Sequence, residues 1–458
     1  MRNPVFGQYI KLSSLAAALL LTIAAAIAAQ TPNTPQLDLA TAVEKAVSGN
    51  PIAKAADTRV KIADLKVREM MTGRRPSIQF SQSAVGSNNP VFVFGSLLEQ
   101  GRFGPSNFSI DSLNKPDGLL NLRSLVSAQM PIFDQHQTRS RVKQAETGRS
   151  QTVLMAEAAR QQLRFEVIRT FYGVILSRSM VGVSKDAITT AEANRKKTKD
   201  LVDVGMTTDA DLLSADVEVA NAVQRRLEAE SELVTTLAAM NLTIGEAADM
   251  DRELKGELRE KFFPVEDRAE LIRLALENRP DYQRALLDIE NSRLQSRAVR
   301  DQRLPRVDAF GNFGYSSPYI TNGSTDYTVG VNLTYTIFDA GRKARTEAAI
   351  EAEALAGHER DNLANQIRLD VIRAHEAFKT SGEKIRVTIK SIAQADEALR
   401  IVEDRYRFGR STFNEVLRAG SALTRAKQDL LNTRYEYYIN YARLLLATGR
   451  LDDVRWFD

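Results

Sequence analysis

The sequence of 458 residues contains no cysteine, a single tryptophan and only three histidines. The absence of cysteine excludes disulfides, thiolate metal sites, cysteine nucleophiles and a lipid-modified N-terminal cysteine. The three histidines, His136, His358 and His375, are widely spaced and match neither a metal-binding pattern nor the HExxH motif. No other residues form a catalytic constellation, so we expect a protein that is not an enzyme and needs no cofactor.

Charge of one sign and long apolar segments are also lacking. The 62 basic and 58 acidic residues nearly cancel, leaving a formal net charge of +4, so composition does not predict nucleic acid as a partner. No later segment reaches the roughly 18 consecutive apolar residues that indicate a transmembrane helix. The contents of 43% hydrophobic and 26% charged residues are those of a folded chain rather than a disordered one.

The N-terminal residues have the pattern of a secretory signal peptide. Arg2 and Lys11 precede an apolar segment at 15–27, and the small-x-small motif Ala-Ile-Ala occupies 26–28. The apolar segment is shorter than the roughly 20 residues that an anchoring helix needs. We therefore expect residues 1–29 to be removed and the mature chain to be exported.

Proline is absent from two long stretches of the chain. None occurs between Pro131 and Pro264, and none follows Pro318. Both stretches are rich in Ala, Leu, Glu, Arg and Gln, which favour helices, whereas proline breaks them. They predict very long helices at 134–203 and 339–407, each about 100 Å long at the α-helical rise per residue. Helices of that length are typical of coiled coils and bundles.

Several sequence landmarks occur twice, about 204 residues apart. An Ile-Phe-Asp tripeptide at 132–134 recurs at 337–339, and a Gly that follows an apolar residue at 205 recurs at 409. Landmarks kept in the same order and spacing indicate an internal duplication. The predicted parts are a first repeat at 30–264, a second repeat at 265–449 and a C-terminal tail at 450–458.

Each repeat is predicted to contain short helices, a strand pair, a very long helix and a medium helix. The first repeat holds a strand pair at 77–133 with an insertion at 82–121, a long helix at 134–203 and a helix at 207–245. The second holds helices at 265–304, a strand pair at 306–338, a long helix at 339–407 and a helix at 411–449. Asp134 and Asp339 suit the N-caps of the long helices, and Gly205 and Gly409 suit tight reversals at their far ends.

The predicted strands alternate between apolar and polar residues. Between Thr328 and Phe338 one face carries Val, Val, Leu, Tyr and Ile, and the other carries Thr, Gly and Asn. An ordinary half-buried sheet is one interpretation, but strands of about ten alternating residues are also what a membrane barrel requires. Four strands cannot close a barrel, and open edges are costly in lipid. Three copies of the chain, giving twelve strands and a lumen, are the economical solution.

The order and spacing of these motifs resemble the TolC family of outer-membrane efflux proteins across the mature sequence. The motifs that carry the resemblance are Leu304-Pro305, Ile337-Phe338-Asp339-Ala340-Gly341-Arg342, Tyr406-Arg407-Phe408-Gly409 and Gly449. The resemblance implies an α+β membrane protein: a homotrimer with a 12-stranded β-barrel, four strands per chain, in the outer membrane. It implies that a long α-helical barrel continues this β-barrel through the periplasm.

The same resemblance implies a function and partners. Members form the exit duct of tripartite efflux pumps or of type I secretion systems. The expected partners are outer-membrane lipid, a periplasmic adaptor (membrane fusion) protein and an inner-membrane transporter of the RND, ABC or MFS class.

The resemblance further implies a gate where the long and medium helices turn, at 204–213 and 407–418. The acidic ring of the gate falls on Glu415, and the hydrogen-bonded pair that holds it shut falls on Tyr406 and Asp211. For such charges a solvated helix face is the plainer interpretation.

Two positions depart from the pattern of the family gate. Arg418 stands where a second acidic residue is expected, which argues against a strongly cation-selective entrance. Ser411 stands at the position of a basic residue, although the adjacent Arg410 could take its place.

Alternatives remain open at this point. A non-conducting periplasmic coiled-coil tether explains the helices but not the strand pairs. Sparse histidine and only nine methionines give no support for a dedicated copper or silver exporter. The insertion at 82–121 is either a partial lid over the exit or a loop packed on a neighbouring copy, and the sequence favours the loop.

Overall fold

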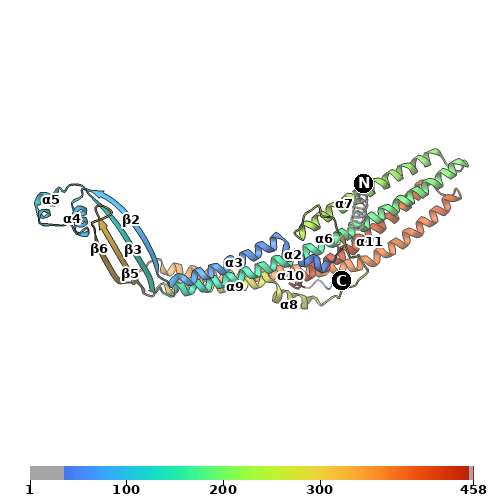
Figure 1. Cartoon of the computed structure of the whole chain (residues 1–458). Coiled ribbons are helices and arrows are strands. Elements are labelled where there is room, and N and C mark those ends of the chain that lie inside the picture. The colour runs from blue at the N-terminus through green and yellow to red at the C-terminus, as the bar shows by residue number, and fades with distance from the viewer. Residues whose placement is uncertain (1–35, 453–456, 458) are drawn as a thin grey trace, which may run out of the picture. The chain divides into compact units, whose positions relative to one another are not determined.

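Figure 1 shows the computed structural model of the chain, which describes residues 36–452 and residue 457. The chain divides into two compact units, each built from separate stretches of sequence. The first unit comprises Met1–Ala53, Arg160–Asp267 and Ile372–Asp458, and the second comprises Lys54–Ala159 and Arg268–Val371. The predicted signal peptide at 1–29 and most of the final residues of the tail lie outside the described residues.

These compact units do not coincide with the two predicted repeats. Residues 30–264 and 265–449 each contribute to both units. The reason is the length of two helices, α6 (Gln137–Asp203) and α10 (Arg342–Arg407), because each supplies residues to both units. The two repeats are a property of the sequence, whereas each compact unit combines corresponding segments from both sequence repeats.

The second unit contains a four-stranded antiparallel sheet with the order β2-β3-β5-β6. Its strands are β2 (Ser77–Ser87), β3 (Leu119–Phe133), β5 (Arg306–Ser317) and β6 (Ser324–Thr334). The strand pair of the first repeat therefore joins that of the second through β3 and β5. Among the described strands, β2 and β6 are paired on one side only and form the two edges of the sheet.

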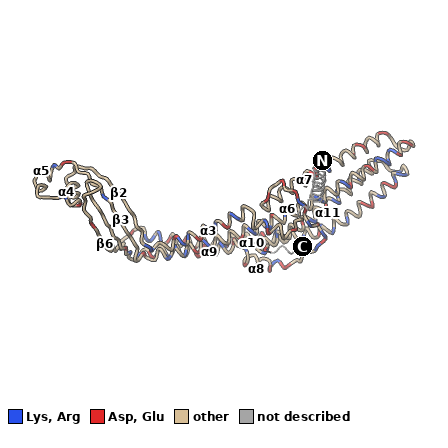
Figure 2. Tube along the Cα trace, viewed as in Figure 1, with Lys and Arg blue, Asp and Glu red and all other residues tan. Residues whose placement is uncertain are grey.

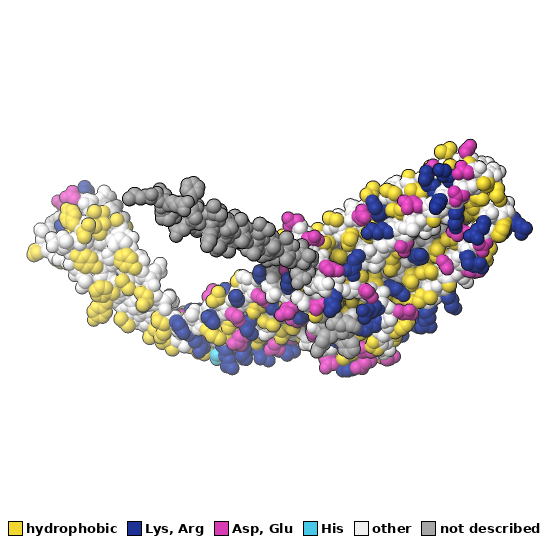
Figure 3. Space-filling view, turned by 45° about the vertical axis from the view of Figure 1, so that its right-hand side comes forward, with side chains coloured by type: hydrophobic (Ala, Val, Ile, Leu, Met, Phe, Trp, Pro, Cys, Tyr) yellow, Lys and Arg dark blue, Asp and Glu magenta, His cyan; other side chains and the backbone are white. Residues whose placement is uncertain are grey.

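The two faces of this sheet differ in polarity. The register aligns Phe80, Val126, Phe313 and Tyr327 in one row across the four strands. Phe80 is 65% exposed and Tyr327 is 80% exposed, although both are large and apolar or aromatic. Hydrophobic side chains gather over the sheet in Figure 3, whereas charged residues are sparse along the strands and frequent along the helices in Figure 2. The opposite face carries mainly Ser, Thr, Asn and Gln.

Ion pairs link neighbouring helices in the helical part of the second unit, whose apolar contacts include the buried Val67 and Leu294. Its helices are α3 (Pro51–Met71), the 3-10 turn η1 (Thr72–Arg74), α8 (Arg268–Asn278), α9 (Pro280–Asp301) and the adjoining parts of α6 and α10. Arg149 of α6 pairs with Asp64 of α3. Arg293 of α9 pairs with Glu353 of α10 at 3.1 Å.

An aromatic cluster forms the core of the first unit. Its elements are α2 (Leu39–Gly49), α7 (Asp209–Thr243), α11 (Phe413–Ala447) and the short parallel pair β1 (Gln36–Leu37) and β4 (Glu253–Leu254), with parts of α6 and α10. Phe263 stacks on Tyr441 with ring centroids 4.1 Å apart, and Phe378 lies 5.0 Å from Tyr437. Within the described part of the chain, no helix combines the length and apolar character needed to cross a bilayer.

The long helices begin later than predicted, and the two predicted N-caps differ in what they do. Gln135 and His136 have φ angles of 59° and 60°, so α6 cannot begin before Gln137. The Asp134 carboxylate still accepts a hydrogen bond from the Thr138 amide at 2.6 Å, so it caps the helix from outside the N-cap position. Asp339 is not an N-cap.

The carboxylate of Asp339 is used in the turn that precedes α10. It accepts a hydrogen bond from the Gly341 amide at 3.0 Å and pairs with Arg345, while α10 begins only at Arg342. Because α10 begins three residues after Asp339, this bond closes a local turn rather than capping the helix.

Strand pairing and a proline also set element boundaries that differ from the predicted ones. The ladder between β2 and β3 continues to Ser87 and Leu119, so the segment outside the sheet is 88–118 rather than 82–121. β6 ends at Thr334 rather than at 338, because its partner β5 begins at Arg306 and offers no further residues. The predicted helical region at 265–304 is two helices, α8 and α9, with Pro280 at the first position of the second.

Replacing Phe378 by alanine tests the aromatic core. Phe378 is 1% exposed, and its truncation removes ring contacts with Tyr437 and Tyr441. We expect Phe378→Ala to lower the free energy of unfolding by about 3–5 kcal/mol, measured by urea denaturation followed by circular dichroism. Replacement of exposed Lys390 in the same helix is the control, with an effect within about 0.5 kcal/mol. Equal effects of the two substitutions would contradict the assignment of this core.

Candidate functional site

Two helical hairpins turn at Gly205 and Gly409 in the same way. Gly205 has φ +74° and Gly409 has φ +65°, a conformation that residues with a Cβ rarely adopt. At the first tip the Met206 amide donates to the Leu201 carbonyl at 2.8 Å. At the second tip the Arg410 amide donates to the Arg405 carbonyl, also at 2.8 Å. Both helices therefore end in a Schellman motif, and α7 and α11 begin a few residues later.

The returning helices are capped by two threonines that the sequence analysis missed. The Thr208 hydroxyl accepts from the Asp211 amide at 3.3 Å, and the Thr412 hydroxyl accepts from the Glu415 amide at 3.4 Å. At Thr412 the bond is reciprocal, because its amide donates to the Glu415 carboxylate at 3.2 Å. The T-x-x-E pattern of a capping box was present in the sequence and is the signal that identifies Thr412.

Glu415 is thus a structural cap at the second tip as well as an exposed acid. The Ser411 hydroxyl donates to its carboxylate, and this bond is the main reason that its pKa is lowered. The Thr412 amide and the positive charges of Arg405 and Arg418 lower the pKa further. The carboxylate is therefore ionised at neutral pH and is held on the side of the turn.

Tyr406 and Asp211 are not hydrogen-bonded to each other within the chain, contrary to the prediction. The Tyr406 hydroxyl donates to the Thr198 hydroxyl at 3.4 Å. The Asp211 carboxylate accepts from the Thr207 hydroxyl. Within the chain, the Tyr406 hydroxyl thus forms a hydrogen bond from α10 to α6, and the Asp211 carboxylate forms one within its own tip.

The second hairpin is joined to α6 by few polar contacts. Besides the bond between Tyr406 and Thr198, Lys197 of α6 pairs with Glu403 of α10 at 3.3 Å. Both side chains of this ion pair are partly exposed, and such pairs contribute only about 0–1 kcal/mol. A cavity of about 350 Å³ lies beside them, lined in part by Leu201. Since the ion pair is partly exposed, the polar contacts of this junction contribute little to the stability of the unit.

Below the second tip, an apolar core joins the two helices of the second hairpin to α7. Phe413, 1% exposed, and Val416, 2% exposed, pack in a cluster with Leu399, Leu423 and Ala215 of α7. The Tyr406 ring packs against this cluster, 5.7 Å from that of Phe413. Near its tip the second hairpin is therefore packed both internally and against Ala215 of α7, whereas its polar contacts with α6 are weaker.

Opposite charges predominate at the two tips. The first tip carries Asp200, Asp203, Asp209 and Asp211. The second carries Arg405, Arg407, Arg410 and Arg418 beside Glu415. Arg410 and Arg418 are exposed, so the acidic Glu415 is flanked by positive charge. Within residues 36–452, no group of three or more acidic or histidine side chains is arranged to hold a metal ion.

Replacing Gly205 by alanine tests the turn geometry. No atom lies within 4 Å of an added Cβ, so the cost comes from the left-handed backbone alone. We expect Gly205→Ala to destabilise the hairpin by roughly 1–2 kcal/mol in urea denaturation. Gly182 in the same long helix has equal space but no positive φ, so Gly182→Ala should instead stabilise by roughly 0.5–1 kcal/mol. Effects of the same sign at both glycines would contradict the turn.

The capping role of Glu415 predicts a pH dependence. Because its pKa is lower in the folded state, its contribution to the first turn of α11 is fully present above the ordinary value of 4.5 and is lost as pH falls through the lowered pKa. We expect hydrogen exchange at the Thr412 and Glu415 amides, corrected for intrinsic rates, to accelerate in that acidic range. In Glu415→Gln this acceleration should be absent, and its persistence would assign the effect to another group.

Comparison with known proteins places this geometry in a family. The sequence profile of the family described as outer membrane efflux protein matches residues 42–246 and 271–450. Outer membrane protein TolC of Vibrio cholerae is 20% identical over 304 residues, covering 65% of this chain and 69% of that protein. The alkaline protease secretion protein AprF of Pseudomonas aeruginosa is 22% identical over 346 residues, covering 72% of this chain and 70% of that protein.

Solved structures share the fold. A crystal structure of CusC superposes with a TM-score of 0.75 at 15% identity, covering 91% of this chain and 93% of that one. The outer membrane channel CmeC of Campylobacter jejuni superposes with a TM-score of 0.74 at 17% identity, covering 90% and 85% of the two chains.

The family match confirms three predictions: the TolC-like family, the location in the outer membrane and the absence of enzymatic activity. Since the profile covers both repeats and both hairpin tips, the chain belongs to the outer membrane efflux protein family, whose members are non-enzymatic channels.

Proposed function

We propose that three copies of this chain form the exit duct of a tripartite efflux pump. The single observation that carries the proposal is the four-stranded sheet with one exposed apolar face and two unpaired edges. An apolar face suits lipid, and a polar face suits a water-filled lumen.

The number of copies follows from the edges. An edge strand in lipid leaves backbone groups without hydrogen-bond partners, so β2 of one copy must pair with β6 of the next until the ring closes. Two copies would give a barrel whose interior is filled by side chains, whereas three give twelve strands and a lumen.

The hairpin tips supply the gate of this duct. The second hairpin is attached to α6 by the hydrogen bond of Tyr406 and the ion pair of Glu403, and it moves outward when both are broken. Glu415 places one ionised carboxylate per chain at the entrance, and the neighbouring Arg418 moderates the preference for cations.

The proposed partners are a periplasmic adaptor protein and an inner-membrane transporter of the RND, ABC or MFS class. A type I protein secretion duct is the second candidate, because one relative is named as a protease secretion protein. Co-purification of an inner-membrane transporter with the cross-linked chain separates the two functions, since pumps for small molecules and exporters of proteins differ in their transporter.

Single-channel conductance in a planar bilayer tests both the pore and the gate. We expect the purified protein to run as a trimer and to give a small, long-lived conductance. The double variant Tyr406→Phe with Glu403→Gln should raise this conductance several-fold, because it removes both links between α10 and α6. Cation preference should fall in Glu415→Gln.

A matched control lies within the second hairpin. Glu436 of α11 pairs with Lys384 of α10 at 3.6 Å, a link that hairpin movement leaves intact. Glu436→Gln should therefore leave the conductance unchanged. A folded trimer that does not conduct, even in the double variant, would favour a periplasmic tether, and an equal rise in the control would contradict the gate.

A further inference from the structure

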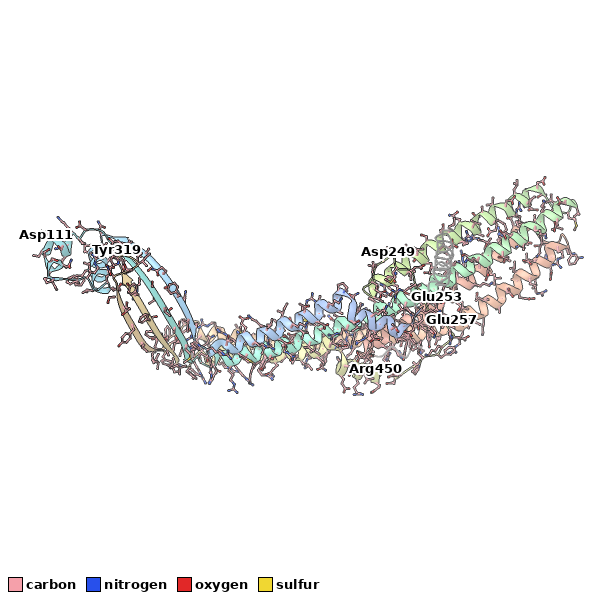
Figure 4. All side chains as sticks on the ribbon, viewed as in Figure 1. Asp111, Asp249, Glu253, Glu257, Tyr319 and Arg450 are labelled. Carbon is pink, nitrogen blue, oxygen red and sulfur yellow. The ribbon has the colours of Figure 1, made fainter. Side chains whose placement is uncertain are left out.

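The segment between β2 and β3 is a small folded element rather than an open loop. It contains α4 (Pro90–Glu99), the 3-10 turn η2 (Pro105–Phe108) and α5 (Ile110–Asn114). Three phenylalanine rings contact one another on it: Phe94 and Phe103 are 4.8 Å apart edge to face, and Phe103 and Phe108 are 5.0 Å apart, although Phe108 remains 67% exposed. Figure 4 labels Asp111 in α5 and Tyr319 after β5, which lie at the same end of the sheet.

One side of α4 is buried. Val93 is 6% exposed, Ser96 is 4% exposed and Gln100, just after the helix, is 3% exposed. Their spacing of three and four residues puts them on one face of the helix. The Gln100 amide nitrogen donates to the Leu120 carbonyl at 2.9 Å and to the Asn121 side chain at 3.0 Å, so this face is bonded to β3.

The end of α4 is also tied across three strands of the sheet by charge. Arg123 of β3 pairs with Glu99 at 3.1 Å and with Asp326 of β6 at 3.0 Å. Glu99 further accepts a weaker hydrogen bond, at 3.4 Å, from the hydroxyl of Ser316 in β5. Side chains from β3 and β5 thus converge on the Glu99 carboxylate of the insertion, and Arg123 links this carboxylate to Asp326 of β6.

All of these partners lie on the polar face of the sheet. Arg123 is directly opposite Ser316, and Asp326 is opposite Gly314, both out of phase with the apolar row at Phe80 and Phe313. A Cβ added at Gly314 would meet Asp326 at 2.7 Å and Arg123 at 2.9 Å, so the glycine makes room for this ion pair. The sheet is therefore shaped to hold the pair that fixes α4.

We propose that residues 88–118 form a lid over the exit of the pore, and that Arg123 is the positioning residue that holds it there. This rests on the proposed function, in which the polar face of the sheet lines the lumen. An element fastened to that face at the end of the strands narrows the lumen, so the exit sets a size limit that is independent of the gate at the hairpin tips.

The charges around Arg123 explain what holds the lid in place and what would free it. One guanidinium lies between two carboxylates, and the Oδ2 atom of Asp326 is buried without a hydrogen-bond partner. Loss of Arg123 would leave Glu99 and Asp326 facing each other unneutralised, and like charges repel. The lid is therefore held closed by a charge balance that one substitution reverses.

Thiol labelling tests the lid without reference to the gate. The chain has no cysteine, so Thr328→Cys introduces a single thiol on the polar face of β6, two residues beyond Asp326. Intact cells carrying the full-length protein are treated from outside with a small charged methanethiosulfonate or with a bulky polyethylene-glycol maleimide. We expect the small reagent to react readily and the bulky one slowly.

Adding Arg123→Gln should raise the rate of the bulky reagent roughly tenfold and leave that of the small reagent unchanged. Glu99→Gln should act in the same direction while leaving Arg123 paired with Asp326, which covers a folding failure of the first variant. The control is Arg306→Gln, which removes an equal charge from the Arg306–Asp308 pair in β5 and should change neither rate.

Each outcome decides between the possibilities. Fast labelling by the bulky reagent with Arg123 in place, or equal effects of Arg123→Gln and Arg306→Gln, overturns the lid and leaves the pore intact; the insertion then packs elsewhere, such as on a neighbouring copy. A thiol that even the small reagent cannot reach in any variant overturns the pore, and the lid with it.

Discussion

Backbone hydrogen bonding at the edges of the sheet is the constraint on which the rest of this structure depends. A strand can satisfy its amides and carbonyls only through a neighbour, and in lipid no water replaces that neighbour. The chain supplies four strands and leaves β2 and β6 each paired on one side. Assembly of several copies is therefore a condition for placing this apolar face in a membrane.

Under the proposed function, ring closure by the strands of several copies would explain why the helices can be so long. In a single chain, some apolar side chains of the helices remain exposed, such as Met155 of the 67-residue helix α6 at 50%. Side-by-side copies held in register by the sheet provide further helices to pack against. Apolar side chains that are exposed in one copy, such as Ile62 at 61% and Leu65 at 60%, are then suited to contacts between copies.

At the second hairpin tip, a residue proposed to act in the gate also stabilises a helix. Glu415 closes the capping box of α11, and the bonds that hold its carboxylate also keep it ionised. Near its tip, this hairpin contacts α6 through the hydrogen bond of Tyr406 and the partly exposed ion pair of Glu403. Weak polar contacts with α6 suit the proposed gate, in which the second hairpin moves away from α6. In the sheet of the second unit, Arg123 holds α4 by charge.

The sequence by itself determined the features that arise from local periodicity. Helix length followed from the distribution of proline, strand character from alternation, the turns from Gly205 and Gly409, and the duplication from repeated landmarks. These depend on the conformational preferences of neighbouring residues, which a sequence carries directly. The capping box at Thr412 belongs to the same class, although it was overlooked.

Only the tertiary structure decided which distant groups meet. Tyr406 bonds to Thr198 rather than to Asp211, and Arg123 of β3 finds Asp326 some 200 residues later in the chain. Left-handed backbone at Gln135 and His136 delayed the start of α6, and the long helices mixed segments of both repeats into each compact unit. Such pairings depend on the register between elements and on competition among nearby partners. The spacing of residues along the chain does not determine this register or this competition, because both arise only when the elements pack.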